Sequence, residues 1–194
     1  MHLHPIRSIS DPLYDRWLDV YQRSFPLQQQ VPVSVHNAAL RPGGMGARDV
    51  RYVVCMGEDD GECLGMAHFE LFKADGTAAL WYLAVAPDRR NEGIGGWMYD
   101  SIMHTMQSED PACKACVIEV ELPDKCADPD LATRRIAFYE RHGAVWLRGC
   151  ASLVDVGWQP PLKMGVMVHP FARLSEHDMR AVARSVLGNL LAED

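Results

Sequence analysis

A glycine-rich turn between an apolar strand and a helix is the segment of this chain whose residue types best suit chemistry. An apolar run over residues 81–86 leads into a loop with two arginines, and closely spaced glycines follow before a helical segment. The first amides of a helix lack partners within it, and the helix dipole favours negative charge there. Glycines let a ligand approach the backbone and allow the positive φ angles that turn amides toward one point. The turn is typical of a pyrophosphate site, although many glycine turns only begin a helix.

The spacing Arg90-x-x-Gly93-x-Gly95 separates this turn from other pyrophosphate loops. It lacks the glycine register and repeated βαβ pattern of a Rossmann fingerprint, and no Gly-Lys-Ser/Thr closes it as in a P-loop. It resembles the acetyl-CoA signature Arg/Gln-x-x-Gly-x-Gly/Ala of the GCN5-related N-acetyltransferase (GNAT) superfamily. The resemblance implies that the pyrophosphate of acetyl-CoA meets the loop amides, with charge added by Arg89 or Arg90. The loop residues are Arg90, Asn91, Glu92, Gly93, Ile94, Gly95 and Gly96.

A second block, residues 134–144, lies one helix and one strand downstream and resembles the family pattern Ala-x-x-Phe/Leu-Tyr-x-x-x-Gly-Phe. By this resemblance Tyr139 lies near the CoA sulfur as the general acid for the leaving thiolate, and Phe138 packs the pantetheine or the core. The alternative for Tyr139 is an aromatic side chain that only packs. Ala132 stands where many relatives have an asparagine that contacts CoA, so Arg134 or Arg135 is a candidate replacement.

The strand before the glycines is apolar on both faces, which predicts a central strand covered on both sides. In the GNAT fold the fourth and fifth strands separate, and the pantetheine pairs with the backbone of the fourth. The resemblance gives these contacts to Leu83, Ala84 and Val85. The Val85 amide is then a donor to the thioester oxygen, where charge develops on attack.

A general base is not found on that strand, since about Ala79 stands where some relatives carry a glutamate. The next candidates are Glu119 and Glu121, which strand alternation places together on one face. Two like charges, partly desolvated, raise one carboxyl pKa. They could relay a proton or bind a cationic substrate, or form a wet face without a role. His68 and His142 are weaker candidates.

The composition is that of a globular domain of 194 residues with a net charge of −7. An acidic balance disfavours nucleic acid as a partner and suits a cationic amine substrate. No window resembles a signal peptide or a membrane span, so we expect a cytoplasmic protein with no membrane association. Six scattered cysteines, including a lone Cys113-x-x-Cys116, indicate free thiols and no metal.

The periodicity predicts alternating strands and helices. A first helix is expected to begin with Asp11 as N-cap and Pro12 at N1, and a last helix to begin at Ser175 with Asp178 completing the cap. Ile94, Met98, Ile102 and Met106 form a core-facing stripe at steps of four. Strands are predicted at 2–9, 51–56, 64–73, 79–86, 117–122, 144–154 and 162–169, and further helices at 32–41 and 129–142, the latter ending at Gly143.

This order matches the GNAT layout along residues 2–170 and implies an α/β (α+β) fold. The expected architecture is a single GNAT domain over residues 1–194 with a mixed, mostly antiparallel central sheet flanked by helices. Residues 170–194 form an extra C-terminal helical extension, which could cover a sheet edge or mediate a homodimer.

The implied activity is N-acetyl transfer from acetyl-CoA to a primary amine by direct attack in a ternary complex, without a metal. A small-molecule amine is the first choice of acceptor and a protein N-terminus or lysine the second. Acceptor choice is expected to depend on residues 26–50, 73–77 and 155–162. Two alternatives remain: a non-catalytic acyl-CoA-binding sensor or regulatory module, favoured by the missing acid on strand 79–86, and another donor such as succinyl-CoA.

Overall fold

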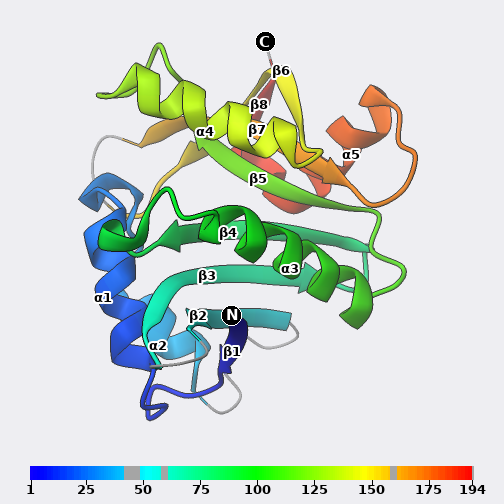
Figure 1. Ribbon diagram of the computed structural model, residues 1–194. Coiled ribbons are helices and arrows are strands. Elements are labelled where there is room, and N and C mark those ends of the chain that lie inside the picture. Colours follow the sequence, from blue (N-terminus) through cyan, green and yellow to red (C-terminus); the bar gives the residue numbers. More distant parts are fainter. Residues whose placement is uncertain (42–48, 58–60, 158–160, 194) are drawn as a thin grey trace.

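The computed structural model describes residues 1–41, 49–57, 61–157 and 161–193, and its eight strands form one sheet (Figure 1). The spatial order is β1-β2-β3-β4-β5-β7-β6-β8, and every neighbouring pair is antiparallel except β4 and β5. The expected mixed, mostly antiparallel sheet is therefore confirmed. The strands are β1 His2–Ile6, β2 Asp49–Met56, β3 Cys63–Phe72, β4 Thr77–Val85, β5 Ala115–Glu121, β6 Val145–Val154, β7 Leu162–Pro170 and β8 Leu191–Glu193.

Helices cover both faces of this sheet. The α-helices are α1 Tyr14–Ser24, α2 Val33–Ala39, α3 Ile94–Glu109, α4 Pro129–Arg141 and α5 Glu176–Leu187, and the 3₁₀ helices are η1 Leu27–Gln29, η2 Pro87–Arg89 and η3 Gly188–Leu190. Alternation along the strands assigns the faces. Ile118 packs with α3 and α4, whereas its neighbour Val117 packs with α5; in the same way, Val53 packs with α3 and Tyr52 with α1. Helices α3 and α4 thus cover one face, and α1 and α5 cover the other.

The apolar stripe on α3 faces the core, as predicted. Ile94, Met98, Ile102 and Met106 are all buried against the sheet. The predicted ends of α4 and α5 are also confirmed. Gly143 follows α4 with a φ of 93°, and the Ser175 hydroxyl and Asp178 carboxylate form a reciprocal capping box at α5.

The predicted start of the first helix is wrong. Helix α1 begins at Tyr14, and its N-cap is Leu13, not Asp11. The Asp11 carboxylate accepts a hydrogen bond from the Leu13 amide at 2.9 Å, and its carbonyl accepts one from Tyr14 at 3.0 Å. Asp11 therefore closes a turn that precedes the helix, because its side chain bonds two residues onward instead of into the first helical turn.

The C-terminal segment does more than add a helix. Helix α5 packs on the sheet face through Met179, Val182, Ala183 and Leu187. The chain then forms β8, which pairs with Cys150–Ser152 of β6 and was not predicted. A three-residue strand is too short to show a period in the sequence. Within the described residues, no helix combines the length and apolarity needed to cross a membrane.

Gly65 allows β3, β4 and α3 to meet closely. It is paired with Val85, and a Cβ atom at Gly65 would lie 2.6 Å from the Ala84 carbonyl oxygen and 2.7 Å from the Met98 sulfur. Any larger residue would therefore push apart the strand and helix that flank the glycine-rich turn.

We predict that Gly65→Ala lowers the free energy of unfolding by about 1–3 kcal/mol, because a backbone oxygen cannot rotate away from the new methyl group. Urea denaturation would measure the change. Gly165→Ala is the matched control: its Cβ would meet side-chain atoms of Leu122 at 3.0 Å and Val120 at 3.3 Å, which can adjust. The explanation fails if Gly165→Ala costs as much as Gly65→Ala.

Candidate active site

The sheet opens between β4 and β5. These strands pair only from Thr77 with Ala115 to Leu80 with Ile118, and beyond that point the described residues give β4 no partner on this side (Figure 1). Residues 81–85 keep β3 as their neighbour on the other side, with an irregular register opposite His68 and Phe69. Backbone groups facing the gap can therefore bond a strand-like ligand. Leu83, Ala84 and Val85, the residues assigned to the pantetheine, all lie along this edge.

The glycine-rich turn lies at the open end of β4. The chain passes through η2, and Asn91 and Gly93 then adopt positive φ angles of 69° and 79° before α3 begins. Gly93 is the N-cap of α3, so the first amides of that helix face outward at this turn. The backbone has the conformation that an anion-binding turn needs.

The two arginines of the turn differ. Arg89 is ion-paired with Glu62 and Glu92, so its charge is balanced within the protein. Glu92 is exposed, and Arg89 holds its carboxylate at 2.9 Å. Arg90 is exposed and has no partner among the described residues. Of the two, Arg90 is therefore the arginine available to a phosphate.

The two sequence blocks meet at the start of α3. A Cβ atom on Gly95 would lie 3.4 Å from a Val85 methyl group and 4.0 Å from the Phe138 ring. A Cβ atom on Gly96 would lie 3.1 Å from the His142 ring, which bonds Asp100 at 2.8 Å. The end of β4, the start of α3 and the end of α4 thus converge, which the separate motifs in the sequence could not show.

Tyr139 reaches from α4 to the gap. It is buried, and its ring lies 5.4 Å from that of Tyr99 and 5.2 Å from that of Phe138. Burial raises the pKa of Tyr139 to about 12, so its phenol is protonated at neutral pH. Arg135, a candidate CoA contact, is ion-paired with Glu121.

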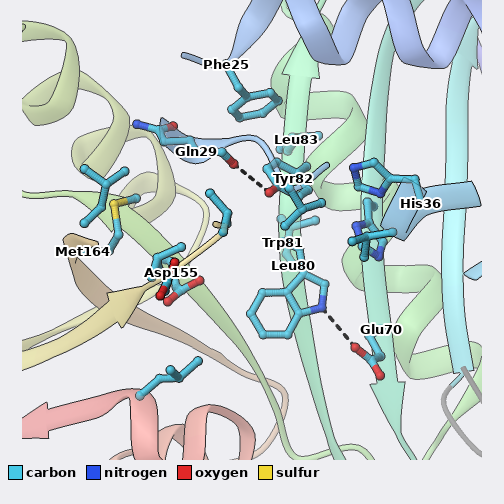
Figure 2. A pocket seen from close by; sticks show the side chains of 18 of the residues that line it. Phe25, Gln29, His36, Glu70, Leu80, Trp81, Tyr82, Leu83, Asp155 and Met164 are labelled. Carbon is cyan, nitrogen blue, oxygen red and sulfur yellow. Dashed lines mark hydrogen bonds between the residues drawn. The ribbon is translucent and has the colours of Figure 1, made fainter. Parts of the chain in front are cut away.

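A cavity of about 290 Å³ opens beside the gap on the face of α1 and α5 (Figure 2). Tyr139 and Glu119 both line it, together with Leu83 and Trp81 of β4. Residues 25–36 and 154–156 supply other walls, so two of the three segments expected to choose the acceptor contribute. Residues 42–48 and 158–160 of those segments lie outside the described residues, and 73–77 is not part of the wall.

The two glutamates of β5 have different surroundings. Glu119 accepts a hydrogen bond from the Ser152 hydroxyl, and burial raises its pKa. Glu121 accepts a hydrogen bond from Gln29 Nε2 at 2.8 Å and pairs with Arg135. The predicted rise of one carboxyl pKa is found at Glu119, and of its two expected causes the loss of water accounts for it. Repulsion from Glu121 does not contribute, because Arg135 balances that carboxylate.

Glu70 and His36 also line the cavity and were not predicted. The Trp81 indole donates a hydrogen bond to Glu70 at 3.2 Å, and His36 bonds the Tyr52 hydroxyl at 3.1 Å (Figure 2). Glu70 could have been found, because it lies two residues from His68 on the same strand face. His36 lies on a short helix that carries no motif.

The two histidines of this wall are neutral. Burial lowers the pKa of His36 to about 4 and that of His68 to about 3. His142 lies elsewhere, beside Gly96, and does not line the cavity.

Within the described ranges, no group of three or more His, Cys, Asp or Glu side chains is placed to hold a metal ion. Cys113 and Cys116 are both buried.

The family model of the acetyltransferase (GNAT) family matches residues 13–144, which include the open sheet, the glycine-rich turn and Tyr139. The chain belongs to the GNAT acetyltransferase family. No curated protein matches the chain at a significant level.

Solved structures share the fold. A GNAT-family protein from Bacteroides thetaiotaomicron superposes with a TM-score of 0.74 at 22% identity, covering 97% of this chain and 99% of its own. Tetrahymena GCN5 superposes with a TM-score of 0.59 at 10% identity, covering 91% of this chain and 99% of its own. The ribosomal-protein-S18-alanine N-acetyltransferase of Escherichia coli superposes with a TM-score of 0.58 at 15% identity, covering 90% of this chain and 97% of its own. At these identities the likeness shows the fold alone.

We predict that the neutral histidines make the protein acid-sensitive. The unfolded chain binds a proton at His36 near pH 6.5, whereas the folded protein binds it only near pH 4. Stability therefore falls as pH falls through this window. Between pH 7 and 5, the free energy of unfolding should fall by about 1–2 kcal/mol less in His36→Phe than in wild type. Urea denaturation at each pH measures this difference.

His104→Gln is the control for this comparison, because His104 is exposed on α3. It should keep the wild-type pH dependence. A His36→Phe variant with the same dependence would contradict a buried neutral imidazole, whatever its stability at pH 7.

Proposed function

We propose that the protein transfers the acetyl group of acetyl-CoA to a primary amine of a small molecule, by direct attack in a ternary complex. The observation that carries the proposal is that Tyr139 and Glu119 line one cavity at the point where β4 and β5 separate. A proton donor and a proton acceptor thus face the same gap from opposite sides of the sheet.

The residues present fit acetyl-CoA. The positive φ angles at Asn91 and Gly93 give the turn the conformation that presents amides to a pyrophosphate. The lack of side chains at Gly95 and Gly96 lets Val85 and His142 pack closely against the start of α3. The open edge of β4 offers backbone groups to a pantetheine arm, and the Val85 amide is the proposed donor to the thioester oxygen. Acetyl-CoA supplies the acyl group as an activated thioester.

Proton transfer is assigned to two side chains. An amine must lose its proton before attack, and a carboxylate with a raised pKa is a suitable acceptor near neutral pH. Glu119 takes this role, while Glu121 holds Arg135 and Gln29 and is given a positioning role. Tyr139, which is protonated at neutral pH, donates its phenolic proton to the leaving thiolate. The nitrogen of the adduct carries one surplus proton after attack, and the transfer of that proton to Tyr139 restores the phenol as the amide forms.

The shape of the cavity supports a small acceptor. Residues 25–36 cover one side and residues 154–156 and 162–164 another, so an amine must enter a space of about 290 Å³. A protein N-terminus or a lysine side chain remains the second candidate, because a relative of the same fold is named for modifying a ribosomal protein.

The first experiment measures CoA release from acetyl-CoA over a panel of amines, amino acids and peptides, with a no-acceptor blank. Turnover with a small amine supports the proposal. Turnover with peptides alone would favour the second candidate. Tight acetyl-CoA binding without any turnover would favour a sensor, and absence of binding would contradict the assignment of the turn.

We predict that Tyr139→Phe lowers kcat by roughly 100-fold or more, because the thiolate then leaves without a proton donor. The Kd for acetyl-CoA, measured by calorimetry, should change by less than about 3-fold. Tyr99→Phe is the matched control, since Tyr99 bonds His169 at 3.0 Å and does not line the cavity. Equal kcat losses in the two variants would count against the acid role.

We predict that Glu119→Gln removes the acidic limb of the pH profile of kcat/KM. In wild type, activity rises with pH as the buried carboxyl, whose pKa is raised, loses its proton. Glutamine keeps the size of the side chain but cannot accept the proton, so a lower, flatter profile is expected. Glu140→Gln, an exposed change on α4, should leave the profile unaltered.

A further inference from the structure

The cavity is walled by rings. Phe25 follows α1, Tyr82 comes from β4, and their ring centroids are 5.0 Å apart at 75°. Tyr52 of β2 stacks on His68 of β3 at 4.4 Å, and the Trp81 indole forms a further wall. Figure 2 shows the Trp81 side chain projecting from β4 with its nitrogen edge toward Glu70. Flat surfaces on several sides favour a flat ligand.

Hydrogen bonds hold two of these rings in place. The Tyr82 hydroxyl donates to the Gln29 carbonyl at 2.7 Å, and the Trp81 Nε1 group donates to Glu70 at 3.2 Å. Both bonds use the polar edge of the ring, and contacts with Tyr21 and Phe25 hold the Tyr82 ring further. The walls are therefore ordered before a ligand arrives, which lowers the entropic cost of binding.

The charges of the cavity favour a cation and oppose an anion. Three carboxylates, those of Glu70, Glu119 and Asp155, are among the described lining residues. Arg135 is the one arginine or lysine in that set, and Glu121 already pairs with it. The two histidines are uncharged at neutral pH, so they add no positive charge. A substrate carboxylate or phosphate would lie unpaired beside like charges.

The volume of the cavity is large enough for a ligand that contains an aromatic ring. An apolar cavity of roughly 150 Å³ is enough for benzene. A space of about 290 Å³ has room for a benzene-sized group and a short aminoalkyl chain reaching toward Glu119.

Resting on the proposed function, we propose that the acceptor is an arylalkylamine: a cationic amine on a short chain that carries an aromatic ring and no carboxylate or phosphate. The ring packs against the wall that Phe25, Trp81 and Tyr82 form, and the amine points to Glu119 at the gap. This class excludes free amino acids, whose carboxylate has no free cationic partner among the described lining residues, and it disfavours aliphatic diamines, which would leave the ring walls unfilled.

The test compares kcat/KM for four matched amines. Phenethylamine and phenylalanine differ by one carboxylate, and butylamine and putrescine replace the ring by an alkyl chain or a second ammonium. We expect phenethylamine to exceed phenylalanine by roughly 100-fold or more, and each aliphatic amine by roughly 10-fold or more. A kcat/KM for phenylalanine or putrescine that equals or exceeds that of phenethylamine overturns the proposal.

Two ring variants locate the binding site. Trp81→Leu and Phe25→Leu should each raise the KM for phenethylamine by roughly 10-fold while changing that for butylamine by less than about 3-fold. The KM for acetyl-CoA should stay the same, which also shows that each variant is folded. Equal changes in KM for both amines in both variants would contradict a ring-specific wall.

Binding separates failure of this inference from failure of the proposed function. If no amine is turned over, calorimetry with CoA present still compares phenethylamine with phenylalanine. Tighter binding of phenethylamine upholds the arylalkylamine site in a protein without transferase activity. Binding of neither compound, or tighter binding of phenylalanine, overturns it.

Discussion

The end of main-chain pairing between β4 and β5 is the constraint on which the rest of the structure depends. The parallel junction runs for four residue pairs and stops after Leu80 and Ile118. Each strand still has a neighbour on its other side, β3 for β4 and β7 for β5, so the sheet stays intact while it opens. Unpaired backbone groups in a protein interior need a partner. The fold thus creates a site for an extended ligand by leaving out one set of hydrogen bonds.

The opening also connects the two faces of the sheet, because residues from helices on both faces reach it. The glycine-rich turn lies at the start of α3, and Tyr139 reaches the gap from α4, on the same face. Glu119 and the ring-walled cavity lie toward α1 and α5, on the opposite face. Two ligands can therefore approach from different sides and meet at one point. The sheet keeps them apart everywhere else.

Much of this fold could be predicted because its signals are local. The stripe of α3, the capping box of α5 and the glycine after α4 each depend on residues within a few positions of one another. The start of α1 was wrong because Asp11 has two local bonding choices, and the sequence does not say which one wins. Strand β8 depends on its pairing with β6, a contact between distant residues that leaves no period in three positions.

The residues of the site also fall into two groups, those that local motifs predict and those that depend on distant contacts. Motif residues such as Gly95, Phe138 and Tyr139 could be named from the chain, and the structure places them together. The ring walls could not be predicted, because Phe25, Tyr52 and Trp81 come from separate elements and look like ordinary core residues. The surroundings of Glu119 and Glu121 also depend on distant partners, Ser152 for the first and Gln29 and Arg135 for the second.

Gln29 has one further consequence. Its carbonyl accepts a hydrogen bond from Tyr82 of β4 and its side chain donates one to Glu121 of β5, so η1 bridges the two strands where their own pairing has ended. A short segment outside the sheet thus contacts both edges of the opening. Changes within residues 25–36 can reshape the space for an acceptor while every strand-to-strand bond is kept. Part of the acceptor space can therefore diversify in a segment outside the strands, while the walls contributed by β4 and β5 stay tied to the sheet.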